Sequence, residues 1–182
     1  MTETEVKIRW PEGRGDPRPA LEYFGYVEIA PRVLEADQLF DRADAQLRNS
    51  GQVLRLRQSG DQAMITYKGP AETDMYKSRE EIEFDVSDPV NVTLLLDRLG
   101  LMPGFRYEKF RTTFSIAGED GVITLDETPI GVYIELEGGK SWIDATAKRL
   151  GFHSSDYITK SYAALYREFR AEHVAAPENM VF

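Results

Sequence analysis

The sequence predicts an α+β fold in which eight antiparallel strands close into a barrel, with a polar lumen and with helices on the outside. One observation behind this prediction is the alternation of charged and apolar residues in nearly every predicted strand. A second is the set of short amphipathic helices predicted between the strands and at the end of the chain. The chain has 182 residues, of which 42% are hydrophobic and 29% charged, so we expect a single domain over residues 1–182.

The first strand is predicted over Glu3–Trp10, where charged and apolar residues alternate. The segment Pro11–Pro19 is rich in proline and glycine, which indicates a loop. Asp16-Pro17 within it opens a short helix that ends at Gly25. A long second strand is predicted over Tyr26–Asp41, with a break as one alternative.

The middle of the chain predicts a hairpin, one further strand and a helix. The hairpin strands are Gln52–Gln58 and Gln62–Lys68, joined by a Ser-Gly-Asp turn. A strand over Lys77–Val86 follows. Asp88-Pro89 then supplies an N-cap residue with proline at the first helical position, and Gly100 ends this helix.

The last third of the chain predicts strands first and helices afterwards. The strands are Phe105–Ala117, Val122–Glu127 and Gly131–Glu137. Ser141 and Asp144 resemble a capping box at the start of the third helix. Ser154 or Ser155 caps the fourth helix, whose apolar residues form one broad stripe. We expect the tail, residues 175–182, to be frayed.

The composition excludes several classes of protein. The absence of cysteine excludes a disulfide framework and a thiolate metal site, and two histidines are too few for a histidine-rich zinc centre. The net charge of −9 argues against nucleic acid and anionic membranes as partners. The N-terminal residues lack the apolar segment of a signal peptide, and no stretch approaches the roughly 20 apolar residues of a membrane span. We therefore expect a cytoplasmic protein.

Residues of the same parity share one face of a strand, and here the charged residues share a face repeatedly. These faces hold Glu3, Glu5, Lys7 and Arg9; Arg55 and Arg57; Lys68; Arg79, Glu81, Glu83 and Asp85; Lys109 and Arg111; Asp126; and Glu135 and Glu137. On a single strand, such a face is ordinarily the solvated side. Because the pattern recurs with both signs of charge, we expect it to line the lumen of a closed barrel; a flat, solvated sheet is the alternative.

The basic members of these faces suit a polyanion. They are Lys7, Arg9, Arg55, Arg57, Lys68, Arg79, Lys109 and Arg111. A guanidinium group binds two phosphate oxygens at once, and lysine adds a compact charge. Enclosing so many charges is costly unless they pair or meet a ligand of opposite charge. We therefore predict that this set binds phosphates.

The acidic members suit a hard divalent cation. They are Glu3, Glu5, Asp126, Glu135 and Glu137. Residues two apart on a strand have Cα atoms roughly 6.5–7 Å apart, so two such glutamates can converge on one ion or flank a pair. Carboxylates without histidine or cysteine select Mg²⁺ or Mn²⁺, which they hold together with phosphate oxygens. The sequence therefore predicts a metal-bound polyphosphate.

The motifs of these strands resemble those of a known family. Glu3-Thr-Glu5-Val-Lys7 is similar to the ExExK signature of the CYTH superfamily, also called triphosphate tunnel metalloenzymes. The further matching motifs are Leu54-Arg55-Leu56-Arg57, Thr66-Tyr67-Lys68-Gly69, Arg79-Glu80-Glu81, Lys109-Phe110-Arg111, Leu125-Asp126 and Glu135-Leu136-Glu137. The resemblance covers essentially the whole chain. It points to the class IV adenylyl cyclase-like and thiamine triphosphatase-like branch, partly through Thr159-Lys-Ser-Tyr162.

The resemblance implies an eight-stranded antiparallel tunnel that binds a triphosphate through divalent metal. It implies that the five acidic residues are metal ligands or their supports, and that the basic set other than Arg9 holds the phosphates. It also implies catalytic roles for Lys7, Glu81 and Glu137, with Glu81 orienting a basic neighbour or a metal-bound water. Relatives form dimers, so a homodimer is one expectation.

Three hypotheses for the function follow. In an adenylyl cyclase, the ribose 3′-hydroxyl of ATP attacks the α-phosphorus and pyrophosphate leaves. In a triphosphatase, water attacks the terminal phosphorus of thiamine triphosphate or inorganic tripolyphosphate. The sequence holds no motif for an adenine pocket, so the preference for the cyclase rests on the resemblance alone. The third hypothesis is a non-catalytic module that binds polyphosphate, for which the basic set alone would suffice.

Overall fold

The structure is a computed structural model and describes residues 2–182. Its strands form one sheet, which closes because β1 pairs with β6 as well as with β9. The strands are β1 (Thr2–Arg9), β2 (Val27–Asp41), β3 (Val53–Ser59), β4 (Gln62–Lys68), β5 (Glu72–Thr73), β6 (Lys77–Asp85), β7 (Met102–Ser115), β8 (Gly121–Thr128) and β9 (Gly131–Gly138). All neighbouring strands are antiparallel, and short β5 adds to the edge of β6. The predicted eight-stranded barrel is confirmed, and the flat sheet is excluded.

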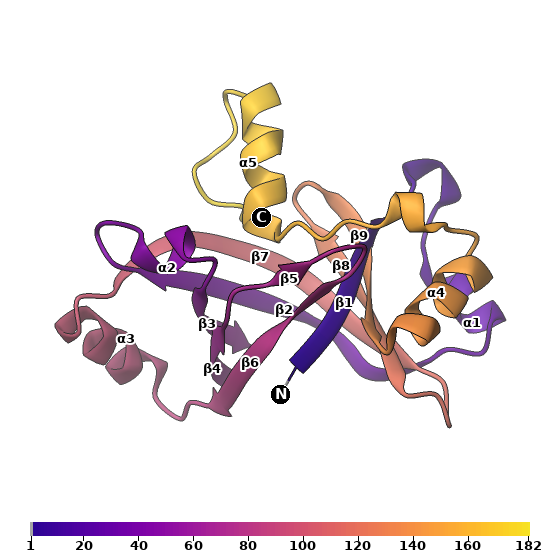
Figure 1. Cartoon of the computed structure of the whole chain (residues 1–182), viewed down its shortest axis with the longest axis horizontal. Coiled ribbons are helices and arrows are strands. Elements are labelled where there is room, and N and C mark those ends of the chain that lie inside the picture. Colours follow the sequence, from indigo (N-terminus) through magenta and orange to yellow (C-terminus); the bar gives the residue numbers. More distant parts are fainter. Residues whose placement is uncertain (1) are drawn as a thin grey trace.

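Five α-helices lie outside the barrel (Figure 1). They are α1 (Arg18–Tyr23), α2 (Gln46–Asn49), α3 (Pro89–Arg98), α4 (Lys140–Arg149) and α5 (Tyr162–Glu172), with 3-10 turns at Glu12–Arg14 and Ser154–Asp156. Figure 1 shows α3 at one end of the barrel, α1 and α4 at the opposite end, and α5 standing over β7. In the described part of the chain, no helix combines the length and the apolar character needed to cross a membrane.

The main hydrophobic core lies between the barrel wall and α4. Outward-facing Val6 of β1 and Leu136 of β9 are completely buried there against Ile143 of α4. Their neighbours along the strands, Lys7 and Glu135, are also buried, but on the lumen side. The strand pleat therefore separates apolar residues outside from ionic residues inside, as the parity of the sequence predicts.

The last helix starts later than predicted. The prediction of a cap at Ser154 or Ser155 is wrong, because a 3-10 turn follows there and α5 begins at Tyr162, capped by Ser161. Ile158, between them, forms a β-bridge with Lys7 through two backbone hydrogen bonds of 2.8 and 3.0 Å. Pairing between β1 and β6 ends at Glu5, so Ile158 satisfies a strand edge that would otherwise be open.

The expected fraying of residues 175–182 is also wrong. Met180 is completely buried, and its backbone forms a parallel bridge with Tyr107 of β7. Beside this bridge, β8 pairs with β7 only over Phe110–Phe114, so the edge around Tyr107 is free to accept another strand. The tail is ordered because it fills this edge and buries one large apolar side chain.

Two smaller differences from the predictions concern the helices. The capping box of Ser141 and Asp144 does not form, because α4 starts at Lys140 with Gly139 as its N-cap. The Asp144 carboxylate instead accepts hydrogen bonds from the hydroxyls of Tyr76 and Tyr157. Helix α2 has no counterpart among the predictions. At four residues, it is too short to show a helical repeat in sequence.

Candidate active site

The barrel encloses a cavity of about 520 Å³ that extends outward to α2 and α5. Most of the predicted site residues line it: Glu3, Glu5, Lys7, Arg55, Arg57, Lys68, Arg79, Glu81, Lys109, Arg111, Glu135 and Glu137. They come from six strands, and the pleat of each strand turns them to the same side. Charged residues far apart in the sequence therefore converge on one enclosed space, whose volume is typical of ligand sites.

Two predicted residues do not line this cavity. Arg9 is exposed, donates a hydrogen bond to the carbonyl oxygen of Ile130 and lies over the ring of Tyr133. It shares the parity of Lys7, but it stands at the last position of β1, beyond the enclosed part of the lumen. Asp126 is completely buried behind the cavity wall. It can support other residues of the site but is not placed to reach a ligand in the cavity.

Buried carboxylates hold the arginines of the site in fixed orientations. Asp37 accepts two hydrogen bonds from Arg57, at 2.8 and 3.0 Å, and Asp126 accepts two from Arg111, at 2.7 and 2.6 Å. Burial alone would raise the pKa of Asp37, but the charges of Arg57 and Arg55 hold it well below its usual range. Both carboxylates therefore stay ionised and align a guanidinium plane beside the cavity.

The lysines of the lumen are also paired. Lys7 donates to Glu135, and Lys77 donates to Glu5. Burial alone would lower the pKa of Lys7, but the nearby charges of Glu135 and Glu5 raise it. Lys7 therefore remains positively charged deep in the barrel.

Glu81 of β6 lies between two cations, one on β4 and one on β6. Its Oε1 accepts hydrogen bonds from Lys68 Nζ, at 2.5 Å, and from Arg79 Nε, at 3.1 Å. Burial and the charges of Arg55 and Arg79 lower the pKa of Lys68 to about 8. This geometry agrees with the expectation that Glu81 orients a basic neighbour.

The glutamates of β1 and β9 form the acidic side of the cavity, where Glu5 lies opposite Glu137 in the strand register. Burial, a hydrogen bond with Glu81 and the charge of Glu137 raise the pKa of Glu3 to about 8. Burial, together with the charges of Glu5 and Glu135, also raises the pKa of Glu137. The ionised forms of Glu3 and Glu137 are therefore disfavoured in the metal-free site, and a bound cation would favour them.

The acidic side suits a divalent cation in its chemistry, although its side chains are not yet gathered around one point. Among residues 2–182, no three Asp, Glu or His side chains converge as a ready metal site. Glu5 and Glu135 instead point at lysines. All the oxygens are hard ligands of the kind that Mg²⁺ and Mn²⁺ prefer, so the donor set fits the predicted ions. A bound ion would compete with the lysines for these carboxylates.

Several site residues were missing from the predicted set. They are Glu35, Asp37, Lys77, Tyr107 and Tyr162. Lys77 carries a signal in the sequence, because it shares strand parity with Arg79 and Glu81. Tyr162 carries none, since its helical spacing indicates packing. In the structure its hydroxyl donates to Asp126 at 2.7 Å, and its ring lies 4.4 Å from Lys7 Nζ.

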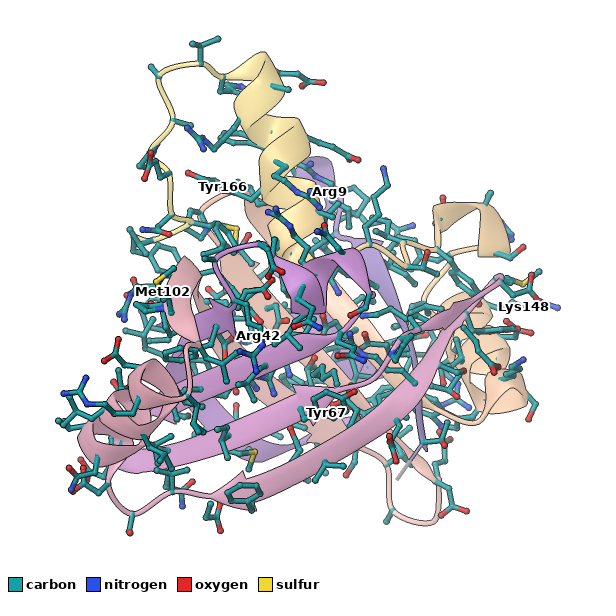
Figure 2. All side chains as sticks on the ribbon, turned by 60° about the vertical axis from the view of Figure 1, so that its left-hand side comes forward. Arg9, Arg42, Tyr67, Met102, Lys148 and Tyr166 are labelled. Atoms are coloured by element: carbon teal, nitrogen blue, oxygen red, sulfur yellow. The ribbon has the colours of Figure 1, made fainter. Side chains whose placement is uncertain are left out.

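The outer part of the cavity is apolar. Leu39 of β2 lies opposite Arg55 in the strand register, and with Val53 of β3 and Phe105 of β7 it forms an apolar section of the cavity wall; the lumen face of β2 then ends in Asp41. Tyr166 of α5 covers this region, and Figure 2 shows it on the side of α5 that faces the C-terminal segment. The cavity therefore has an ionic inner half and an apolar outer half.

Comparison with known proteins agrees with this geometry. The CYTH domain profile matches residues 1–162. A protein of Methanocaldococcus jannaschii, named "Putative adenylate cyclase MJ0240", is 27% identical over 176 residues, covering 91% of this chain and 98% of that protein.

Solved structures share the fold. A "putative adenylate cyclase" from Vibrio parahaemolyticus matches with a TM-score of 0.78 and 18% identity, covering 92% of this chain and 98% of the other. HpAC1 from Hippeastrum, called a "putative adenylyl cyclase" with a dominant triphosphatase activity, matches with a TM-score of 0.67 and 15% identity, covering 92% and 95%. Since the profile match extends over most of a chain whose barrel encloses the expected ionic residues, the protein belongs to the CYTH domain family.

Proposed function

We propose that the protein is a divalent-metal-dependent enzyme that binds ATP in the tunnel and converts it to cyclic AMP and pyrophosphate. The observation that carries this proposal is the two-part cavity, whose ionic half suits a triphosphate and whose apolar half suits the organic part of a nucleotide. Inorganic tripolyphosphate would use only the ionic half. The name of the M. jannaschii relative supports the same reaction.

The balance of charges supports a role for metal. The basic side chains of the inner half are Lys7, Arg55, Arg57, Lys68, Lys77, Arg79, Lys109 and Arg111. The acidic side chains in and directly behind it are Glu3, Glu5, Glu35, Asp37, Glu81, Glu83, Asp126, Glu135 and Glu137. Because the two sets nearly cancel, a triphosphate that entered alone would add about four uncompensated negative charges. Divalent cations entering with it would restore the balance.

The side chains of the inner half have different roles in this proposal. Asp37 and Asp126 fix the planes of Arg57 and Arg111, so these donors are oriented before substrate arrives. Lys7 stays charged and would stabilise the negative charge that develops on the phosphates. Glu3, Glu5 and Glu135 would hold Mg²⁺ or Mn²⁺, which supplies charge neutralisation and Lewis-acid chemistry at phosphate oxygens when bound.

The cyclase reaction forms a bond between the ribose 3′-oxygen and the α-phosphorus and breaks the bond from that phosphorus to the β-phosphate. The hydroxyl proton must go to a base, and we assign this role to the carboxylate of Glu137. Burial and the charges of Glu5 and Glu135 raise its pKa, which makes it a better proton acceptor than an ordinary carboxylate.

A triphosphatase is the second candidate. The observation that favours it is that the inner half holds enough ionic groups to bind a triphosphate by itself, so water attacking a terminal phosphorus would need nothing from the apolar half. HpAC1, which shares the fold at 15% identity, is described as having this activity. Thiamine triphosphate and inorganic tripolyphosphate are the substrates to compare.

A product assay tests the proposal. The purified protein is incubated with ATP, thiamine triphosphate or tripolyphosphate and with Mg²⁺, Mn²⁺ or EDTA, and the products are separated. We expect cyclic AMP and pyrophosphate from ATP with metal and neither product in EDTA. Orthophosphate from thiamine triphosphate or tripolyphosphate, without cyclic AMP from ATP, would contradict the cyclase and support the triphosphatase.

The Glu5→Gln variant separates an enzyme from a binding module. The change keeps the shape of the side chain but removes a charge that would hold the metal, so we expect kcat to fall about 100-fold or more while tripolyphosphate still binds. The control is Glu80→Gln, which makes the same change on an exposed residue of β6 and should leave kcat unaltered. A polyphosphate-binding module would show no turnover in any of these proteins.

A further inference from the structure

Three arginines form a basic rim at the outer end of the cavity. They are Arg48 at the end of α2 and Arg167 and Arg170 on α5. All three line the cavity beyond the apolar half, and all three are exposed. They come from two separate elements, α2 and α5, so the rim does not belong to one helix.

The rim differs from the inner half in how its charges are compensated. Within residues 2–182, no carboxylate oxygen lies within 4.0 Å of a guanidinium nitrogen of Arg48, Arg167 or Arg170. Each inner cation, by contrast, has such a partner; Lys7 with Glu135 and Arg57 with Asp37 are examples.

Two acidic residues share the rim, and neither cancels it. Asp41 lies close enough to Arg48 for the two charges to interact. Its carboxylate oxygens, however, accept hydrogen bonds from the backbone N–H groups of Arg42, Leu47 and Arg48. Glu178 lines the cavity from the C-terminal segment. The rim is therefore net positive, and its guanidinium groups remain available to an anion.

The apolar half separates the rim from the inner cations. Leu39, Val53 and Phe105 lie between the two basic regions and offer a phosphate chain neither charge nor hydrogen bonds. A longer inorganic polyphosphate would have to cross this wall. An organic group can occupy it favourably and can carry a second anionic group to the rim.

We infer that Arg48, Arg167 and Arg170 form an outer anion site that binds a further phosphate on the organic part of a triphosphate substrate. The inference rests on the proposed function, because it takes the triphosphate to lie in the inner half. It narrows the substrate class to nucleoside triphosphates that carry an additional phosphate and keep the 3′-hydroxyl free, for example with the extra phosphate at the ribose 2′-position. The inner half then supplies the chemistry, and the rim supplies specificity.

Binding measurements test this inference. Isothermal titration calorimetry in EDTA, which prevents metal-dependent turnover, compares ATP, tripolyphosphate, a longer linear polyphosphate and ATP carrying an extra 2′- or 3′-phosphate. We expect at least one of the extra-phosphate nucleotides to bind about tenfold more tightly than ATP, as two charge-assisted contacts at a partly exposed site would give. The preference should weaken as salt is added.

Variants assign the effect to the rim. Arg167→Gln and Arg170→Gln should each reduce the preference for the extra phosphate, and together they should abolish it, while tripolyphosphate binding changes less than about twofold. The matched control is Arg98→Gln, which removes an exposed arginine from the last turn of α3 and should change nothing.

The outcomes distinguish this inference from the proposed function. Equal affinity for ATP and both extra-phosphate nucleotides, or a preference that survives the double substitution, would overturn the outer site and leave the proposed function standing. A longer polyphosphate that binds about tenfold more tightly than tripolyphosphate would also overturn the outer site, because the phosphate chain itself would then reach the rim. Failure of tripolyphosphate to bind even when Mg²⁺ is supplied with it would overturn the proposed function and the outer site together.

Discussion

Asp37 and Asp126 lie beneath the cavity, fully buried, and each accepts two hydrogen bonds from one arginine. Neither lines the cavity itself, so their contribution is to hold Arg57 and Arg111 in place. Such a buried pair adds little net stability over an apolar pair of similar size. Removing one partner, however, is strongly destabilising, because it leaves an uncompensated buried charge.

Asp37→Asn should therefore destabilise the protein by about 3 kcal/mol, since Arg55 and Arg57 each lose one buried counter-charge and keep a second, Glu83 and Glu35. Urea unfolding at neutral pH measures the change. Asp61→Asn, at an exposed turn, is the control and should stay within about 0.5 kcal/mol of wild type. Tripolyphosphate should recover part of the loss, because it offers the arginines a new partner. A decrease in unfolding free energy of less than about 1 kcal/mol would show that Asp37 is not a buried counter-charge of these arginines.

Glu3 makes stability depend on pH in the metal-free protein. Its pKa in the folded state is about 8, against an ordinary value of 4.5, so the folded state keeps a proton that the unfolded state releases. Stability should therefore fall as pH rises from about 4.5 to about 8. In EDTA, the difference in unfolding free energy between pH 5.5 and pH 8.5 should be smaller in Glu3→Gln than in wild type. Identical pH profiles would contradict the raised pKa.

Among single residues, strand parity predicts the lumen well. It places Lys68 and Lys109 correctly because the period of a strand leaves only two faces to choose between. Parity does not show where the enclosed part of a strand ends, so Arg9 is predicted inside although it lies outside. Nor does it distinguish a residue that lines the lumen from one buried behind it, as with Asp126.

At the level of elements, the segments outside the predicted strands complete the barrel edges. Ile158 pairs with the free part of β1, and Met180 pairs with the free part of β7. Both pairings join residues distant in sequence, and neither segment is long enough to show alternation. The local sequence pattern therefore predicts a helix start near Ile158 and a frayed tail around Met180. In the structure, closing the barrel leaves strand edges unpaired, and these two segments pair with them.

Met180 tests whether the C-terminal bridge stabilises the fold. It is completely buried among aromatic residues that include Tyr107 and Tyr166. Met180→Ala should lower the unfolding free energy by about 2–3 kcal/mol, the lower part of the range for buried methionine. Val174→Ala, at a side chain that is 90% exposed, is the matched control and should have little effect. Equal stability of both variants would mean that the tail is frayed in solution, as the sequence alone suggests.

For the molecule as a whole, the predicted barrel, its ionic lumen and its outer apolar core follow from one repeated pattern, seen in pairs such as Lys7 beside Val6. The two-part cavity does not follow from it. The apolar half arises where β2, β3 and β7 run past the ionic region and α5 lies across them. That arrangement depends on strand lengths and on the course of the last 30 residues, neither of which alternation encodes.

The near balance of charge in the tunnel also makes a prediction for the whole molecule. Glu5 and Glu135 form ion pairs with Lys77 and Lys7 in the structure. An ion or a triphosphate that binds alone must therefore break these pairs and leave one partner of each without a counter-charge. Entering together, the triphosphate takes the lysines and the ion takes the carboxylates, so each favours the binding of the other.

Thermal unfolding detects this coupling. The increase in Tm with Mg²⁺ and tripolyphosphate together should exceed the sum of the increases with each alone, because ligands that bind the folded state cooperatively stabilise it more than additively. Glu5→Gln should weaken the excess, since the ion loses a carboxylate while the triphosphate keeps its lysines. Mg²⁺ with sulfate controls for ionic strength and for weak anion binding. Strictly additive increases in Tm in the wild-type protein would mean that the triphosphate binds independently of the metal. The charge balance of the lumen would then not explain a preference for a metal-bound substrate.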